Sequence, residues 1–169
     1  MNKLNKNSVS LAGEFAVLSQ LALRGYDANM TLGNTKNVDI LVSNPSNGRM
    51  FKLEVKTNYQ STRSIGGSSK LFGKYVSSWL MSEKHEKITD PDLFYCFVNI
   101  GKETNTFKFY IVPSSIVATY VKVQHELWLK GRVTAETPLR QFRMGIEGEK
   151  YPISTPTTEK YENNWDFNR

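Results

Sequence analysis

Two adjacent stretches of the chain decide the fold: NVDILVS at residues 37–43 and RMFKLEVKTN at residues 49–58. In each stretch apolar and polar side chains alternate, which is typical of a strand with one buried face. The residues between them, Asn-Pro-Ser-Asn-Gly at 44–48, are strong turn formers. The pattern therefore predicts a β-hairpin made of strands 38–43 and 50–57.

The polar face of this hairpin carries the candidate chemistry. Because side chains alternate along a strand, Glu54 and Lys56 share one face, and in a hairpin that pairs in register Asp39 falls on the same face. Two convergent carboxylates make the oxygen-rich environment that Mg²⁺ prefers. A neighbouring ammonium can orient or deprotonate a metal-bound water, or offset charge in a transition state. A Glu-x-Lys triplet alone is weak evidence, because the solvated face of a two-stranded ribbon also carries such charges.

A predicted helix supplies a third carboxylate. Residues 9–24, VSLAGEFAVLSQLALR, have apolar residues at helical spacing and are followed by Gly25, a common helix stop. Glu14 falls within the apolar stripe of this helix, which comprises Leu11, Phe15, Leu18, Leu21 and Ala22. A carboxylate in that stripe points toward the sheet, where burial is costly unless a cation or a proton compensates. We therefore expect Glu14 to face the hairpin.

The net charge of +6 arises in the first half of the chain. Residues 1–82 carry ten Lys or Arg and four acids, whereas residues 83–169 carry twelve of each. Three of the four acids of the first half are Glu14, Asp39 and Glu54. A one-sided basic surface suits a polyanion such as nucleic acid, although charge alone would favour a merely basic soluble protein.

The composition excludes several other classes of site. Cys96 is the single cysteine, so an intramolecular disulfide framework is impossible, and with only two histidines no Cys/His metal cluster can form within one chain. The sequence contains no Gly-rich phosphate loop, Ser/His/Asp set or nucleophile elbow. It also has no signal-peptide pattern and no apolar run near the roughly 18 residues of a membrane span. We therefore expect a cytoplasmic protein with no membrane partner.

The rest of the chain extends an α/β pattern. The elements that follow or flank the hairpin are a short strand over 26–32, a basic loop over 58–70, a helix over about 72–86, strands over 93–101 and 106–113, and a helix from Ser114 or Ser115 to about 129. This order predicts a mixed sheet flanked by helices. Beyond Gly131 the pattern is weak, so we expect a core of residues 1–130 and a C-terminal extension, residues 131–169, that packs on the core or on a partner.

The order and spacing of these motifs resemble the PD-(D/E)xK nuclease superfamily, and in plan the archaeal Holliday-junction resolvases and small restriction-type enzymes. The resemblance covers residues 9 to about 112. The matching segments are Gly13-Glu14, Val38-Asp39-Ile40 and Glu54-Val55-Lys56-Thr57. Val38 stands where the family often has proline. The resemblance implies a restriction-endonuclease-like αβββαβ core with a mixed central sheet, and a Mg²⁺-dependent endonuclease that hydrolyses DNA.

The resemblance also implies roles for individual residues. Asp39 and Glu54, with the backbone carbonyl of Val55, would hold Mg²⁺, for which Mn²⁺ can substitute. Lys56 would position or activate the attacking water. Glu14 would assist at a second metal ion or its water shell.

The residues that follow the lysine are candidates for contacts with DNA. Arg63 and Lys70 in the basic loop, Lys74 just after it, and Gln60 near its start are expected to reach phosphates. Small nucleases often cut two strands as dimers, so we also expect a homodimer. Two other functions stay open: a non-catalytic nucleic-acid-binding or protein-interaction module on the same fold, and a nuclease that acts on RNA.

Overall fold

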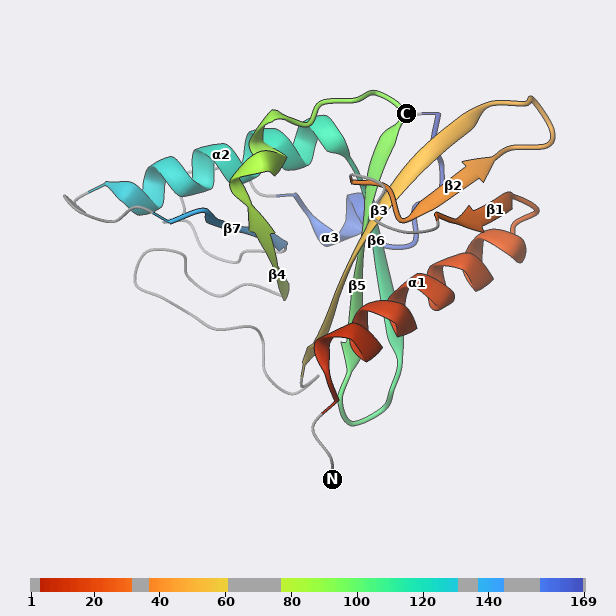
Figure 1. The fold of residues 1–169 in the computed structure, drawn as a ribbon, viewed down its shortest axis with the longest axis horizontal. Coiled ribbons are helices and arrows are strands. Elements are labelled where there is room, and N and C mark those ends of the chain that lie inside the picture. Colours follow the sequence, from red (N-terminus) through yellow and green to blue (C-terminus); the bar gives the residue numbers. More distant parts are fainter. Residues whose placement is uncertain (1–3, 32–36, 61–76, 131–136, 145–155, 169) are drawn as a thin grey trace.

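The structure, a computed structural model, describes five ranges of the chain: residues 4–31, 37–60, 77–130, 137–144 and 156–168. Its centre is a five-stranded mixed sheet with the strand order β1-β2-β3-β5-β6 (Figure 1). The strands are β1 (Asp27–Met30), β2 (Ile40–Ser43), β3 (Met50–Gln60), β5 (Leu93–Gly101) and β6 (Phe107–Pro113). β3 and β5 run parallel, and the other neighbours run antiparallel. The predicted hairpin is confirmed as β2 and β3.

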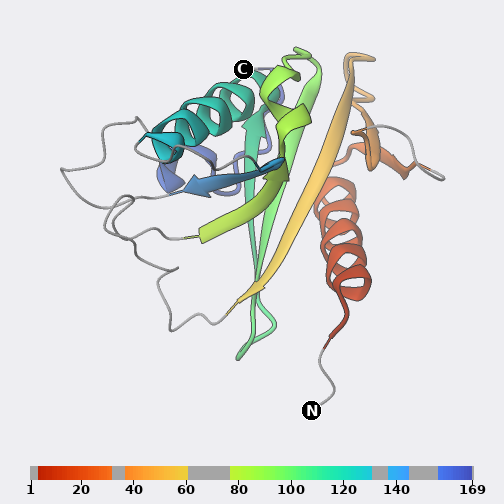
Figure 2. The same ribbon diagram turned by 60° about the vertical axis from the view of Figure 1, so that its left-hand side comes forward.

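The helices cover opposite faces of this sheet (Figure 2). α1 (Lys6–Ala22) packs on one face, chiefly against β3. α2 (Ser114–Leu129) lies on the other face with a two-stranded sheet made of β4 (Ser77–Ser82) and β7 (Leu139–Met144). The short 3₁₀ turn η1 (Glu83–Lys87) follows β4 and packs against α2. No described helix is long and apolar enough to cross a membrane.

Each face of the sheet has its own hydrophobic core. On the α1 face, the buried side of β3 packs against Val17 and Leu21 of the helix. On the other face, Trp79 and Phe142 of the small sheet pack against Phe97 of β5. Burying one such side chain contributes roughly 1.5–3 kcal/mol. β5 is covered on both faces, which explains its nearly continuous apolar sequence.

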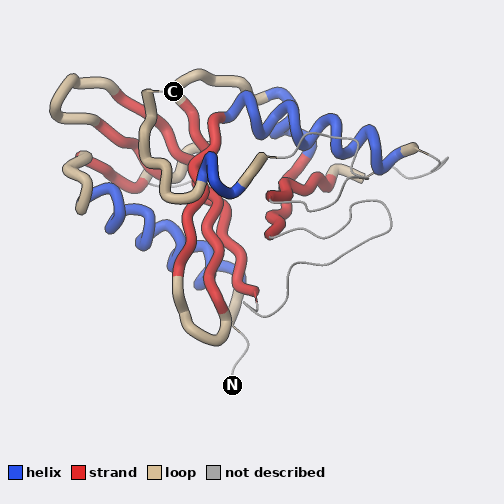
Figure 3. The backbone as a smooth tube through the Cα atoms, turned by 180° about the vertical axis from the view of Figure 1, so that it is seen from behind, coloured by secondary structure: helices blue, strands red, loops and turns tan. Residues whose placement is uncertain are grey.

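The C-terminal residues contribute to both cores: Trp165 and Phe167 to the one on the α1 face, and Tyr161 to the one on the α2 face. Phe167 is fully buried, and its ring stacks on Phe51 with 5.1 Å between centroids. α3 (Thr158–Tyr161) packs against β6, and from behind it is seen over the central strands (Figure 3). The boundary at residue 131 and the packing of the extension on a partner stay predictions.

α1 turns a different face toward the sheet than its apolar pattern predicts. Leu11 and Phe15 of the predicted stripe are 46% and 56% exposed, whereas Gly13 is buried. A Cβ atom at Gly13 would lie 1.9 Å from Oγ1 of Thr57, so only glycine allows the helix to approach β3 this closely. Glu14 is next to this contact and is half-buried.

The helix predicted over 72–86 is wrong in the part that the structure describes. Residues 77–82 form β4, in which Ser77, Trp79 and Met81 are buried in alternation, and residues 83–87 form η1. Pairing with β7 fixes this extended conformation. β7 itself lies in the region where the sequence pattern predicts no element, and residues 72–76 lie outside the described residues.

Candidate active site

The candidate site lies at the point where β2 leaves β3. The ladder between the two strands ends at the pair Ile40 and Leu53, while β3 continues along β5. Asp39 directly precedes β2, and its Oδ2 accepts a hydrogen bond of 2.6 Å from the backbone N–H of Val55. The Asp39 carboxylate thus accepts a hydrogen bond from a backbone N–H of β3 that lies beyond the end of the ladder with β2. This hydrogen bond holds Asp39 beside Glu54.

Glu54 is a buried carboxylate with strong partners. Its side chain is 3% exposed, and its Oε1 lies 2.6 Å from Nζ of Lys56 and 3.2 Å from Nε2 of His85. Burial by itself would raise the pKa of this carboxyl, but the hydrogen bonds and charges of His85 and Lys56 outweigh it and lower the pKa to about 2. Glu54 is therefore ionised at neutral pH. Its other oxygen, Oε2, is buried and has no hydrogen-bond partner in the part of the chain that the structure describes.

The pKa values of Asp39 and Glu14 shift in the opposite direction. Burial raises the pKa of Asp39, and the charge of Glu54 adds to the rise, while a backbone hydrogen bond and Lys56 reduce it. Burial also raises the pKa of Glu14, and here the charge of Asp39 adds to the rise. Lys56 acts electrostatically on all three carboxylates. The structure thus brings together the four residues predicted from the sequence, and their roles stay predictions.

The chemistry of this group suits a hard divalent cation. Its carboxylates supply oxygen donors, the buried Oε2 of Glu54 has no partner among the described residues, and a cation would relieve the repulsion between Asp39 and its neighbours. As the side chains stand, no three Asp, Glu, His or Cys residues within the described ranges are close enough together to hold a metal ion. Two carboxylates supplemented by a backbone carbonyl and water are therefore the donor set to consider.

Two residues that no sequence motif marks also belong to the surroundings of Glu54. His85 of η1 is 3% exposed, and its ring packs edge-on against Tyr95 with 5.8 Å between centroids. Tyr95 is the partner of Glu54 in the parallel ladder. Burial raises the pKa of its hydroxyl, and the Glu54 carboxylate adds to the rise, so Tyr95 stays neutral. The spacing of Ser82 and His85, that of a helix cap, is the one sequence signal that points to the histidine.

Gln60 is the predicted DNA-contacting residue that the structure places. It ends β3, and its Nε2 donates to Oγ of Ser77 at 3.1 Å. Asn58 of the same strand reaches the same hydroxyl at 2.9 Å, so these two amides tie β3 to β4. The other predicted contacts lie outside the described residues: Arg63, Lys70 and Lys74. The nucleic-acid role of all four stays a prediction.

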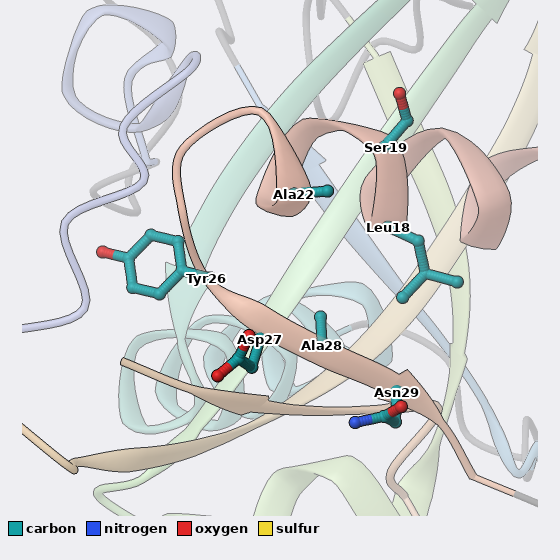
Figure 4. A pocket seen from close by; sticks show the side chains of 7 residues that line it. All are labelled: Leu18, Ser19, Ala22, Tyr26, Asp27, Ala28 and Asn29. Atoms are coloured by element: carbon teal, nitrogen blue, oxygen red, sulfur yellow. The ribbon is translucent and has the colours of Figure 1, made fainter. Parts of the chain in front are cut away.

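In the described part of the chain, surface hollows are found away from the four candidate catalytic residues. One, of about 740 Å³, lies between α1 and the start of β1, where Leu18, Tyr26 and Asp27 are among its lining residues (Figure 4). Another, of about 310 Å³, lies between α2 and the small sheet and includes His125 and Arg140. None of the four candidate catalytic residues is among the described residues that line them. The candidate site is therefore defined by its charged side chains and by neither hollow.

Comparison with solved structures shows that the fold is restriction-endonuclease-like. A solved structure to which the chain is similar is that of I-Ssp6803I, a bacterial homing endonuclease. The two chains are 12% identical, the TM-score is 0.52, and the match covers 96% of this chain and 90% of the other. No protein-family model and no curated protein matches the sequence. The predicted fold class is confirmed, and at this level of identity the likeness concerns the fold alone.

Proposed function

We propose that the chain is a Mg²⁺-dependent endonuclease that hydrolyses phosphodiester bonds of DNA by attack of a metal-activated water. The observation that carries this proposal is the contact between Lys56 and the buried, ionised Glu54, with Asp39 fixed beside them. Burial of a charged group costs free energy, and charged groups with strongly shifted pKa values cluster at functional sites. The fold, which this chain shares with a homing endonuclease, supports the same assignment.

The carboxylates are the residues that would hold the ion. When bound, Mg²⁺ supplies a water of lowered pKa and balances charge on the phosphate. Glu54 is suited to bind it because this carboxylate is ionised and its Oε2 is not used by a described residue. Asp39 is suited because one oxygen is fixed by the N–H of Val55. The backbone carbonyl of Val55 would complete the set, and Glu14 would act at a second ion or through the water shell.

Lys56 would act on the attacking water. Its side chain is 27% exposed, so the ammonium faces both the buried Glu54 and the solvent from which water and substrate arrive. From there it can hold a water by a hydrogen bond and offset the charge that develops on the phosphate. DNA would be bound by the basic first half of the chain, through Arg63, Lys70, Lys74 and Gln60. A homodimer would allow both strands to be cut.

The experiment that tests this proposal is cleavage of several nucleic acids with and without metal. Supercoiled plasmid, a four-way junction, single-stranded DNA and RNA are incubated with the full chain in EDTA, Mg²⁺ or Mn²⁺. We expect DNA to be cut only with a divalent ion, and Glu54→Gln to abolish the cleavage. Cleavage of RNA alone would assign the chain to the RNA nucleases.

A non-catalytic nucleic-acid-binding module is the second candidate function. The observation that favours it is that no three potential metal ligands gather among the described residues. Salt-sensitive binding of DNA with no cleavage of any substrate, in either metal ion, would support this module and contradict the nuclease.

A further inference from the structure

Four consecutive residues of the short turn η1 each contact another part of the molecule, two of them at or next to β7. These contacts are the N–H of Glu83 to the carbonyl of Pro138 (2.8 Å), Nζ of Lys84 to Oδ1 of Asn37 (2.7 Å), Nε2 of His85 to Glu54 (3.2 Å), and the carboxylate of Glu86 to Arg140. The turn is thus tied to β7 on one side and to the start of β2 and the middle of β3 on the other. A ring that is held by such a turn is firmly placed.

The orientation of the His85 ring follows from its two nitrogens. Nδ1 lies 3.0 Å from the backbone N and 2.9 Å from the backbone O of Ser82. It can accept from the N–H when the ring is neutral, or donate to the carbonyl when the ring is charged. Nε2 faces Glu54, and an ionised carboxylate can only accept a hydrogen bond. In both states of the ring, therefore, Nε2 carries a proton and donates it to Glu54.

The two carboxylate oxygens of Glu54 therefore differ in their hydrogen-bond partners. Oε1 accepts from both His85 and Lys56, whereas Oε2 has no partner among the described residues. Lys56 is partly exposed and carries its ammonium on a flexible stem, so it can move when substrate arrives. His85 is 3% exposed and cannot move in the same way. The buried ring is the donor that keeps Oε1 engaged.

We propose that His85 is a positioning residue of the candidate active site, which holds Glu54 in the orientation that leaves Oε2 available to a divalent cation. This inference rests on the function proposed above. His85 would not touch the substrate or the reacting atoms. It acts through Glu54 in the way that outer partners orient metal-binding carboxylates.

A matched pair of substitutions separates positioning from packing. His85→Phe keeps an aromatic ring against Tyr95 but has no N–H. His85→Gln loses the ring but can place an amide N–H near the position of Nε2. If His85 positions Glu54, glutamine restores function and phenylalanine does not, whereas a residue that matters only for packing gives the reverse order.

The experiment uses the full chain with three readouts: plasmid cleavage over a series of Mg²⁺ concentrations, the rise of Tm on addition of Mn²⁺, and the DNA Kd without metal. For His85→Phe we expect a loss of about 10–100-fold in cleavage rate or in the affinity for the ion, with an unchanged DNA Kd. His85→Gln should stay close to the wild type. His125→Phe is the control, because His125 stacks on Trp128 in α2, at 5.6 Å between centroids, away from Glu54.

Two outcomes would overturn the inference and leave the proposed nuclease function intact. These are a His85→Phe variant with wild-type metal dependence, or a His85→Gln variant that loses as much as His85→Phe. A wild type that neither cuts DNA nor responds to Mn²⁺ would instead refute the proposed function, and this inference with it.

A direct measurement covers the case in which His85→Phe does not fold. In ¹⁵N-labelled wild-type protein, NMR should detect a proton on Nε2 of His85 that exchanges slowly with water. Its chemical shift should move in Glu54→Gln, because the acceptor loses its charge. Absence of a proton on Nε2 would refute the hydrogen bond on which the inference depends.

Discussion

Lys56 is the residue that best separates catalysis from binding. Lys56→Ala removes the ammonium 2.6 Å from Glu54 but takes only one charge from a broad basic surface. We expect cleavage to fall on the order of 10²-fold or more, and DNA affinity to change by no more than one phosphate contact. Lys52→Ala is the matched control, because Lys52 lies on the same strand and pairs with Asp90 at 2.6 Å. Equal losses of cleavage and binding would show that Lys56 only binds DNA and has no separate role in catalysis.

Asp39→Asn tests the metal site through stability. Asparagine can still accept the hydrogen bond from Val55 but carries no charge. Because the folded state raises the pKa of Asp39, its ionisation costs stability as pH rises through that raised pKa. Since this cost comes chiefly from burial of the charge, we expect a higher Tm without metal at neutral pH, by roughly 2–4 °C for each kcal/mol of ionisation cost removed. Thermal melts with and without Mg²⁺ should also show that the rise in Tm expected for the wild type is lost. A variant that still responds to metal would remove Asp39 from the site.

Glu54 should affect stability with the opposite sign. Its pKa is lowered from 4.5 to about 2, so the stability that it contributes is present above pH 4.5 and is lost as pH falls from about 4.5 to about 2. Glu54→Gln should be less stable than the wild type at pH 7, and this difference should shrink over that acid range. Urea unfolding at a series of pH values measures it. A constant difference down to pH 2 would contradict the lowered pKa.

At the scale of the elements, the sequence predicts what local patterns determine. The β2–β3 hairpin follows from alternation and a turn, and it carries Asp39, Glu54 and Lys56 with it. The six residues of β4 are too few to distinguish a strand from a helix, and their conformation is fixed by pairing with β7, far along the chain. The contact of His85 with Glu54 depends on that pairing, so no local pattern could reveal it.

The approach of α1 to the sheet depends on a single glycine. Ala is normally more favourable than Gly inside a helix by up to about 1 kcal/mol. At position 13 a Cβ would meet Oγ1 of Thr57 at 1.9 Å, so we expect Gly13→Ala to destabilise the chain by about 1–3 kcal/mol instead. Denaturant unfolding measures the change. Adding Thr57→Ala should restore part of the lost stability. If Gly13→Ala instead stabilised the chain, the contact between α1 and Thr57 would not be tight.

At the scale of the whole molecule, the uneven charge predicts how nucleic acid is bound. Binding should weaken steeply with salt, because Lys and Arg that neutralise phosphates release counterions. Reversing the charges of Arg63, Lys70 and Lys74 together should flatten the salt slope. The control reverses three exposed lysines of the neutral second half, Lys87, Lys122 and Lys130. A larger effect from the control would refute binding through the first half.

The sequence pattern predicts most strands of the central sheet. It does not predict that C-terminal side chains fill the core behind that sheet. Strands over 93–101 and 106–113 are nearly continuous apolar runs, and they form β5 and β6 at nearly these bounds. Trp165 and Phe167, by contrast, lie in a segment with no periodic pattern. Their burial depends on the surface offered by Phe51 and its neighbours, which exists only once the sheet has formed.

The buried Phe167 also sets the order of events during synthesis. Its ring contacts Tyr26, Phe51 and Phe94 at 5.1–5.4 Å, so the core behind β3 closes only after residue 167 has left the ribosome. At about 5–20 residues per second, that residue follows Lys56 by on the order of ten seconds. Throughout that interval the nascent chain exposes apolar strands to chaperones, and the acidic side chains around Lys56 have no finished scaffold. If Lys56 and the neighbouring carboxylates cleave nucleic acid as proposed, we expect that activity to begin only after residue 167 has been synthesised.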